Sequence, residues 1–215
     1  MKKVLITGAG GSVGTALVGG LSAHYEVIGS RRNHELYPLD VTNPEQWESL
    51  MPAFEQGLDA VVHTVGDFLY EPLERCDPEQ WRAIMASNVD SAFYAYRFSR
   101  QALRQRRGRL ILFGLAGLSS ARAEPNLAAY AAAKSAVASL VASIAQIEAP
   151  YGVTCNLIAP GLLHDASAEE VERYRVPKGR TATEDELVTT VAYLLDSSAD
   201  QVTGTTLALS GGWRL

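Results

Sequence analysis

Near its amino terminus the chain reads Val4-Leu5-Ile6-Thr7-Gly8-Ala9-Gly10-Gly11-Ser12-Val13-Gly14. A short apolar run leads into closely spaced glycines, and helical periodicity begins directly after them. In this order of strand, tight turn and helix, the glycines let a phosphate approach the backbone closely. The unpaired N–H groups and the positive end of the helix then point at that phosphate. It predicts a dinucleotide-binding α/β fold, with a purely structural turn as the alternative. The residues expected at the phosphates are Gly8, Gly10, Gly11, Ser12, Val13 and Gly14.

Short apolar runs and helical stretches alternate along the rest of the chain. Strands are predicted at Val4–Thr7, Glu26–Ser30, Ala60–Thr64, Arg109–Gly114, Thr154–Ala159 and Thr206–Ser210. Helices are predicted at Val13–His24, Pro44–Phe54, Pro78–Gln105, Ala128–Ala149 and Glu184–Leu195. Several strands are too apolar for a sheet with one face in water, so helices should cover both faces. We therefore expect one doubly wound, Rossmann-like α/β domain over residues 1–215, with a central parallel sheet flanked by helices.

One connection is too short for a normal crossover helix. Only ten residues separate the end of the second strand at Ser30 from Asp40, whereas a crossover between parallel strands takes a dozen or more. We expect a loop or a single turn here, most simply a tolerated deletion at the sheet edge. Such a deletion would leave one side of an adenosine pocket open.

Composition excludes several classes of protein. A net charge of −5 argues against a nucleic-acid surface, and the dense basic run at residues 104–109 is typical of a helix end, where cations complement the dipole. No apolar run reaches the length that spans a bilayer. Cys76 and Cys155 match no metal or redox spacing, and no metal site is implied. We expect a cytoplasmic protein without a membrane or nucleic-acid partner.

The second strand ends in a pair of cations instead of a carboxylate. A carboxylate at this point would bind a ribose 2′-hydroxyl, as NAD binding usually requires, whereas Arg31 and Arg32 suit a 2′-phosphate. This favours NADP(H) over NAD(H). Two solvated arginines on a loop are the alternative.

A phenol and an ammonium stand one helical turn apart at Tyr130 and Lys134. Residues at i and i+4 share a helix face, so Lys134 is expected to lower the pKa of Tyr130 and make it a usable proton donor to a carbonyl oxygen. Taken alone the pair is weak evidence, since an ordinary helix with an exposed lysine has the same pattern.

Taken in order, these motifs resemble the short-chain dehydrogenase/reductase family over nearly the whole chain. The resemblance rests on the glycine loop, Asp40-Val41, Asn88, Tyr130-x3-Lys134, Pro160-Gly161 and Gly211-Gly212. It implies that Asp40 and Val41 lie by the adenine. It also implies that Thr64-Val65-Gly66 occupies the position of the family's Asn-Ala-Gly segment. Asn88 would help to hold a proton-relay water, and Pro160-Gly161 would close over the nicotinamide. The resemblance implies an NADPH-dependent reductase of a small carbonyl or imine substrate, free or carrier-bound, and a homodimer or homotetramer.

Three departures from the family pattern are visible. Ser12 stands where the main branch has a glycine, and Thr64 replaces an asparagine. The third concerns the catalytic serine, because Gly114 and Leu115 occupy its slots; the nearest hydroxyls belong to Ser119 and Ser120. Without that donor a substrate oxyanion loses one hydrogen bond, worth roughly two to three orders of magnitude in rate at similar sites. The alternative function is therefore a weak or inactive NADP(H)-binding sensor or scaffold of the same fold.

Overall fold

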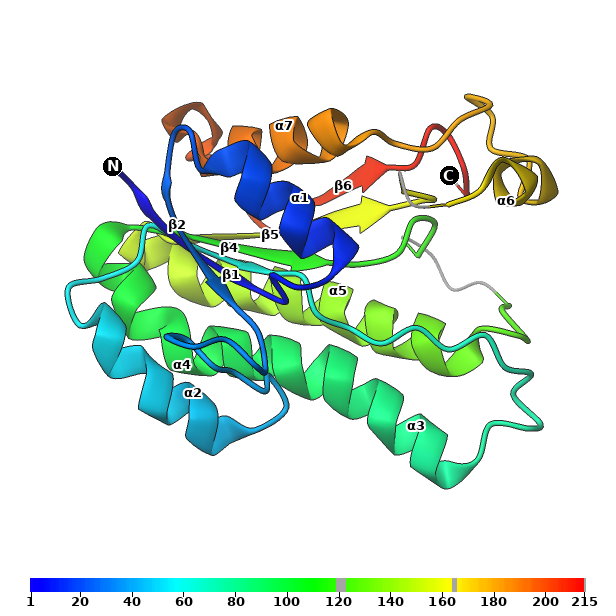
Figure 1. Cartoon of the computed structure of the whole chain (residues 1–215), viewed down its shortest axis with the longest axis horizontal. Helices are drawn as coiled ribbons and strands as arrows, with labels where there is room; N and C mark the ends of the chain where they lie inside the picture. The colour runs from blue at the N-terminus through cyan, green and yellow to red at the C-terminus, as the bar shows by residue number, and fades with distance from the viewer. Residues whose placement is uncertain (119–122, 164–165, 215) are drawn as a thin grey trace.

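A computed structural model describes residues 1–118, 123–163 and 166–214 of the chain. Six parallel strands form one twisted sheet in the order β2-β1-β3-β4-β5-β6 (Figure 1). Their bounds are β1 Lys3–Thr7, β2 Glu26–Ser30, β3 Ala60–His63, β4 Arg109–Phe113, β5 Thr154–Pro160 and β6 Thr206–Leu209. The predicted doubly wound, Rossmann-like sheet is confirmed, and all six predicted strands are present to within one residue at each end.

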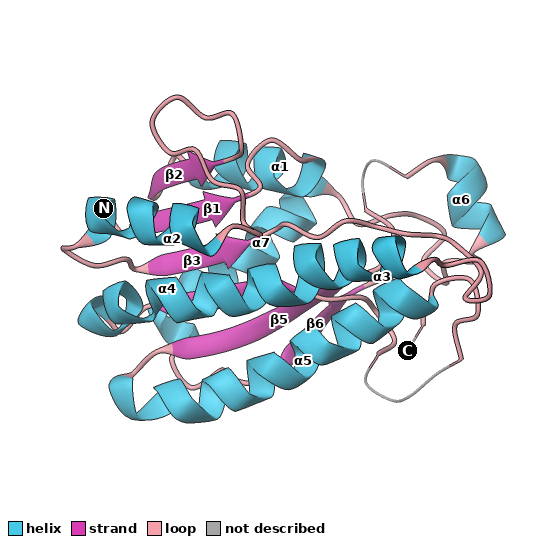
Figure 2. Cartoon of the chain, turned by 90° about the horizontal axis from the view of Figure 1, so that it is seen from below, coloured by secondary structure: helices cyan, strands magenta, loops and turns pink. Residues whose placement is uncertain are grey.

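Helices cover both faces of the sheet. On one face lie α1 Ser12–Leu21 and α7 Glu184–Leu195, and on the other α2 Pro44–Leu50, α4 Ser91–Arg106 and α5 Ala128–Glu148 (Figures 1 and 2). The remaining helical elements are η1 Met51–Phe54, α3 Pro78–Met85, η2 Ala86–Asp90, η3 Ala149–Tyr151, α6 Ala168–Arg173 and η4 Ser197–Ala199. The short helix α6 was not predicted.

Alternation along the buried strands divides the core into two layers. Leu5, Val61 and Leu110 face α2, α4 and α5, whereas their neighbours Val4 and Val62 belong to the cluster under α1 and α7. Successive side chains of a strand point to opposite faces, so strands apolar at every position can fill both layers. The fold therefore leaves only the two ends of the strands free for chemistry.

Capping residues determine where several helices begin. Asn43 accepts hydrogen bonds from the first turn of α2, and Asp77 and Thr183 form capping boxes at the starts of α3 and α7. These side chains satisfy N–H groups that have no partner inside the helix.

The predicted helix Pro78–Gln105 is interrupted. It divides into α3 and α4 around a π-helical turn, η2, at Ala86–Asp90. A π-turn inserts one residue into the helical repeat and occurs frequently at functional sites. Its position matters because it holds Asn88.

The crossover from β2 to β3 is made by α2 and η1, but the short stretch from Ser30 to Asp40 contains no helix. Residues 31–43 form a loop, tied back by a single bridge between Arg31 and Pro38. The expectation of a loop is confirmed, and β2 is the edge strand of the sheet.

One expectation from composition is wrong. The segment Ala128–Tyr151, which includes α5, is long and apolar enough to cross a bilayer by length and composition. In this fold α5 packs against β5 and α4, and residues such as Val137 and Val141 are buried in the core cluster on that face of the sheet. Core packing therefore accounts for its apolar character.

A buried carboxylate joins the two helices that flank the candidate site. Glu148 at the end of α5 is 1% exposed and accepts two hydrogen bonds from Arg104 of α4, at 2.8 and 2.9 Å, and one from Tyr96, at 2.8 Å. Burial alone would raise the pKa of Glu148, but these hydrogen bonds hold it below its ordinary value. The ion pair thus fixes α5 against α4.

Replacing Glu148 by Ala should lower the free energy of unfolding by about 3 kcal/mol, because it leaves the Arg104 guanidinium and the Tyr96 hydroxyl unpaired. Chemical denaturation measures the change. Glu55→Ala, at an exposed carboxylate, is the matched control and should stay within about 0.5 kcal/mol of wild type. An equal effect of the two substitutions would contradict the structural role of the pair.

Candidate active site

The glycine loop between β1 and α1 has the backbone geometry that close approach of a ligand needs. Gly8 has a φ of +77°, and a Cβ there would lie 2.7 Å from Val65 Cγ2. The N–H groups of Gly8 and Ala9 both donate to the Ser30 carbonyl, at 2.9 and 3.1 Å. A Cβ on Gly14 would stand 2.2 Å from the Gly8 carbonyl oxygen, so only glycine allows the helix to start so near the strand.

A cleft of about 870 Å³ begins at this loop and follows the carboxyl ends of the strands. Its lining includes the predicted cofactor residues Gly8, Gly10, Gly11, Arg31, Arg32, Asp40, Val41, Thr64, Val65 and Gly66. A Cβ placed on Gly10 would lie 3.3 Å from Arg31 Cδ, which puts the Arg31 side chain beside the glycine loop. The volume is in the range of small-molecule sites.

Asp40 stays ionised at the outer wall of the cleft. Its carboxylate accepts hydrogen bonds from the Thr42 hydroxyl at 2.7 Å and the Thr42 N–H at 3.0 Å. These bonds, assisted by the positive charge of Arg32, hold the pKa of Asp40 below its ordinary value. The cleft lining therefore carries the fixed negative charge of Asp40, and also the carboxylate of Asp67, together with two arginines.

Asn88 is held in the π-turn with one side-chain atom unused. Its Nδ2 donates to the carbonyls of Asp67 and Ile84, both at 3.0 Å. Its Oδ1 is buried and has no hydrogen-bond partner among the described residues. A buried acceptor without a partner is costly, so this atom is a place for a water or ligand group.

The unused oxygen and the Lys134 ammonium converge on one point at the end of the cleft. A Cβ on Gly66 would lie 2.3 Å from Asn88 Oδ1 and 2.9 Å from Lys134 Nζ. Only a glycine at position 66 leaves this point free. Segments that are distant in sequence thus meet where the cleft ends.

Tyr130 and Lys134 lie in the first two turns of α5, as predicted, but their expected electrostatic relation is wrong. Burial raises the pKa of Tyr130 to about 12, and burial lowers that of Lys134 to about 8. Lys134 Nζ donates to the Phe113 carbonyl at 3.0 Å and lies 5.5 Å from the centroid of the Tyr130 ring. Desolvation outweighs the attraction that the spacing predicted, so Tyr130 carries its proton at neutral pH.

The strand end beside Tyr130 has no side-chain hydroxyl in the serine slots. A Cβ on Gly114 would lie 2.7 Å from Leu157 Cδ2, so the first slot is sterically closed. Leu115 occupies the second slot and is half-buried. The alternative donors, Ser119 and Ser120, lie outside the described residues.

Some predicted cofactor residues lie apart from the cleft lining. Ser12 lines a separate depression between α1 and the start of α7. Pro160 ends β5, and a Cβ on Gly161 would stand 3.0 Å from Ser210 Cα, next to the end of β6. Both residues are at the carboxyl edge of the sheet, beyond the described cleft wall.

Sequence reasoning missed the role of His63, the last residue of β3. Its Nδ1 lies 2.8 Å from Thr7 Oγ1 and its Nε2 3.1 Å from Ser91 Oγ. Because the Ser91 hydroxyl already donates to the Ser87 carbonyl at 2.6 Å, it accepts from His63 Nε2–H, and Nδ1 accepts from Thr7. The imidazole thereby ties the strand before the glycine loop to the turn that holds Asn88.

A glycine loop at the head of a parallel sheet, with buried Asn and Lys side chains and a half-buried Tyr at the same edge, defines a Rossmann-type nucleotide-binding protein. A family model described as enoyl-(acyl carrier protein) reductase, from the short-chain dehydrogenase/reductase family, matches residues 9–214. The 3-oxoacyl-(acyl-carrier-protein) reductase FabG of Vibrio cholerae is 31% identical, over 98% of this chain and 96% of that protein. The chain therefore belongs to the short-chain dehydrogenase/reductase family and is an oxidoreductase.

Two further relatives indicate the range of the family around this chain. The 2-dehydro-3-deoxy-D-gluconate 5-dehydrogenase of Bacillus subtilis is 28% identical, over 99% of this chain and 94% of that one. A gluconate 5-dehydrogenase from Burkholderia cenocepacia, solved in complex with NADP and tartrate, superposes with a TM-score of 0.89 at 28% identity, over 99% of this chain and 94% of its own.

Stability should fall in acid because of His63. Burial, with a smaller contribution from the Lys134 charge, lowers the pKa of His63 to about 3 from an ordinary 6.5. Between these two values the unfolded chain binds a proton that the folded chain excludes. The His63 contribution is thus complete above pH 6.5 and declines by about 1.4 kcal/mol per unit as pH falls toward 3.

Denaturation of wild type and His63→Gln across this window measures how the free energy of unfolding changes with pH. This change should be smaller in the variant, because its unfolded chain binds one proton fewer. His24→Gln, at an exposed histidine, should keep the wild-type slope. Parallel curves for wild type and His63→Gln would contradict the prediction.

Proposed function

We propose that this protein is an NADPH-dependent reductase that delivers hydride to the carbonyl or imine carbon of a small molecule, with Tyr130 as the proton donor. One observation carries the proposal. Asn88 Oδ1, buried and without a partner in the described part of the chain, converges with Lys134 Nζ beside Tyr130 at the end of the cleft. A purely structural site has no need to leave a buried acceptor unsatisfied.

The described cleft fits a dinucleotide that carries a 2′-phosphate. Gly8, Gly10 and Gly11 would receive the pyrophosphate, and the Ser12–Gly14 segment would supply the helix end. Arg31 and Arg32 would pair with the 2′-phosphate, because they are the cations of this cleft wall. The structure solved with NADP supports the choice of NADP(H) over NAD(H).

The adenine and nicotinamide ends follow from the same arrangement. Asp40 and Val41 would lie at the adenine, and Thr64-Val65-Gly66 would pass beneath the coenzyme, where Gly66 leaves space. Pro160 and Gly161 would face the nicotinamide. When bound, NADPH supplies the hydride; the side chains of the protein orient the reactants and supply the proton.

Proton delivery would run through three side chains. Tyr130, whose pKa burial raises to about 12, is protonated at neutral pH and would give its proton to a developing oxyanion. Lys134, whose pKa burial lowers to about 8, still carries its charge at pH 7 and would stabilise the phenolate left behind. Asn88 Oδ1 would hold the water that returns a proton to Lys134 and then Tyr130.

The surroundings of Tyr130 favour a carbonyl on an apolar or acyl chain. Phe68 packs edge-on against the Tyr130 ring at a centroid distance of 5.1 Å and remains 63% exposed. Tyr70 and Leu73, on the same loop, are also exposed. An apolar rim of this kind suits a 3-oxoacyl group on a carrier protein, the substrate for which the FabG relative is named, better than it suits a sugar acid.

We further expect a cytoplasmic homodimer or homotetramer. Phe93 on α4 and Ile147 on α5 are 43% and 53% exposed, which gives these two helices apolar surface for a second copy. Sedimentation or light scattering measures the assembly.

Tyr130→Phe should abolish NADPH oxidation with an acyl-thioester ketone such as acetoacetyl-coenzyme A, because the proton donor is lost while the coenzyme cleft is intact. Absorbance of the reduced nicotinamide measures turnover, and fluorescence titration with NADPH should give an unchanged dissociation constant. Tyr70→Phe is the control that removes a nearby phenol. Turnover equal to wild type in Tyr130→Phe would exclude this mechanism, and NADPH binding without turnover of any ketone by wild type would favour the sensor alternative.

Leu115→Ser should raise kcat by roughly 10- to 100-fold, because it supplies the oxyanion donor that the strand end lacks. Leu115→Ala controls for loss of bulk and should give no comparable gain. If neither variant exceeds wild type, another group already stabilises the oxyanion or the chemical step does not limit the rate. Rapid-mixing measurement of the hydride step separates these two causes.

A further inference from the structure

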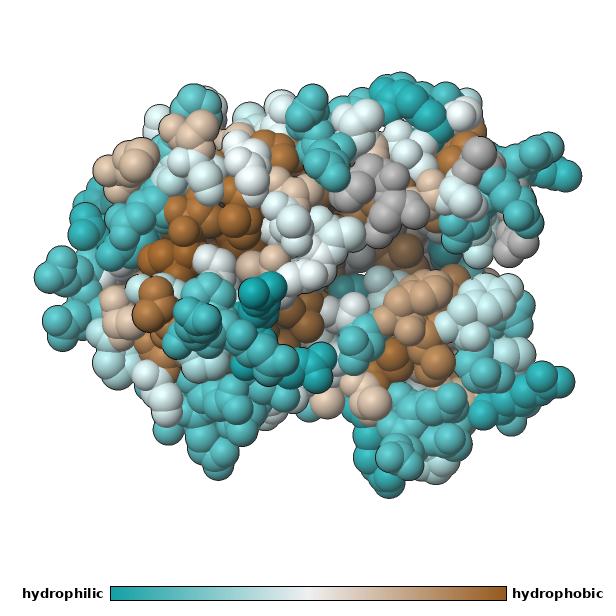
Figure 3. Space-filling model, in the orientation of Figure 1, coloured by the Kyte–Doolittle hydropathy of each residue, from teal (hydrophilic) through white to brown (hydrophobic). Residues whose placement is uncertain are grey.

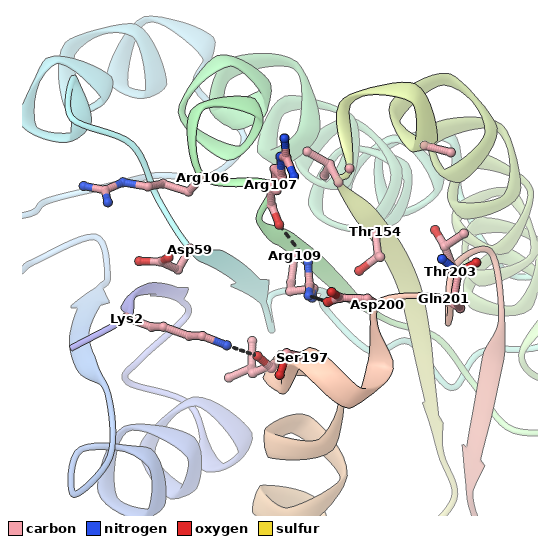
Figure 4. A pocket seen from close by; sticks show the side chains of 14 residues that line it. Lys2, Asp59, Arg106, Arg107, Arg109, Thr154, Ser197, Asp200, Gln201 and Thr203 are labelled. Atoms are coloured by element: carbon pink, nitrogen blue, oxygen red, sulfur yellow. Dashed lines mark hydrogen bonds and ion pairs between the residues drawn. The ribbon is translucent and has the colours of Figure 1, made fainter.

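A second cavity lies at the opposite end of the sheet from the candidate active site. It has a volume of about 480 Å³ and is bordered by the first residues of β4 and β5, the end of α4 and the turn after α7 (Figure 4). The catalytic groups described above are at the carboxyl ends of the strands. This cavity is at their amino ends, so it is a separate site.

Two buried polar groups in its wall lack partners. Arg109 is 8% exposed and Thr154 is 4% exposed, yet Arg109 Nε and Thr154 Oγ1 have no hydrogen-bond partner among the described residues. The two residues are register partners on adjacent parallel strands, so their side chains project from the same face of the sheet. Both are potential donors, and one oxygen-rich ligand placed between them would satisfy both.

The charge around the cavity is positive although the chain as a whole is negative. The lining contains four cationic residues, Lys2, Arg106, Arg107 and Arg109, and two carboxylates, Asp59 and Asp200, an excess of two positive charges against a net charge of −5 for the whole chain. Arg106 Nε is already used, since it donates to the Gln56 carbonyl at 2.9 Å.

The existing bonds leave part of this positive charge available. The Arg109 guanidinium donates to the Arg107 carbonyl and pairs with Asp200, and Lys2 Nζ donates to the Leu195 carbonyl at 2.9 Å (Figure 4). In the described part of the chain, the Arg107 guanidinium has neither an ion pair nor a hydrogen bond, and Figure 4 shows it pointing away from Arg109 and Thr154. The basic run at residues 104–109 does end a helix, as expected, since α4 stops at Arg106 and Arg107 takes the left-handed conformation. Its last residues also form one wall of this cavity.

We propose that the amino edge of the sheet binds a small oxyanion, the phosphate or carboxylate group of a metabolite, between Arg109 and Thr154 with Lys2 at the rim. Guanidinium groups pair with either anion, and a hydroxyl adds a directed donor. The site is independent of the coenzyme cleft and of the reaction there.

Because phosphate would also compete at the coenzyme cleft, the test uses protein saturated with NADPH. Calorimetric titration with inorganic phosphate, and separately with citrate, is compared with chloride at matched ionic strength. Saturable binding of phosphate or citrate, but not chloride, is expected, and the stronger of the two identifies the ligand group.

Thr154→Val removes only the hydroxyl and should weaken that binding by roughly tenfold, the usual effect of losing one hydrogen bond to a charged group. Lys2→Gln, at the rim, should weaken binding as well and covers the case in which the valine variant does not fold. Arg97→Gln, at an exposed residue of α4, removes the same charge elsewhere and should leave the affinity unchanged. Absence of saturable binding, or equal affinity in all the variants, would mean that the cavity holds only water and would overturn the proposal.

Discussion

Burial of the sheet on both faces is the constraint on which the rest of this molecule depends. Helices lie on both surfaces of the sheet, and apolar side chains of the inner strands β1, β3, β4 and β5 fill the two layers between strands and helices. Polar groups can therefore reach solvent only at the strand ends. The cleft that ends at Gly66, next to Lys134, lies at the carboxyl ends, and the cationic cavity around Arg109 lies at the amino ends. On the face that Figure 3 shows, hydrophilic side chains dominate the periphery, and hydrophobic ones gather in recesses toward the middle.

Close packing between distant segments gives the candidate active site its form. The π-turn at Ala86–Asp90 aims Asn88 at the end of β3, and α5 brings Lys134 to the same point. A residue larger than glycine at position 66 would occupy the space in which Asn88 Oδ1 and Lys134 Nζ face each other. His63 stabilises this arrangement through its hydrogen bonds with Thr7 and Ser91. The arrangement is thus built from backbone proximity as much as from the polar side chains themselves.

The strands, most helices and the glycine loop could be predicted because they depend on local patterns: period-2 and period-3.6 apolar spacing and the positions of glycines. The π-turn could not, since residues 78–105 have ordinary helical composition and the turn lies where this segment packs against α5, a contact that local sequence does not reveal. The pKa of Tyr130 was misjudged for a related reason. Sequence spacing shows that Lys134 shares its helix face, but it shows neither the burial of the phenol nor the Phe113 carbonyl that the ammonium contacts. The His63 bridge was equally hidden, because its partners lie 56 and 28 residues away.

The loop at residues 31–43, which follows the edge strand β2, has a consequence for how firmly a coenzyme is held. Because β2 is the edge of the sheet, Arg31 and Arg32 stand in solvent instead of under a further strand. Charges in that position are screened over about 8 Å at physiological ionic strength. If the protein has the proposed function, its preference for a phosphorylated over an unphosphorylated coenzyme therefore depends on ionic strength. The preference is strongest in dilute buffer and weakens as salt is added.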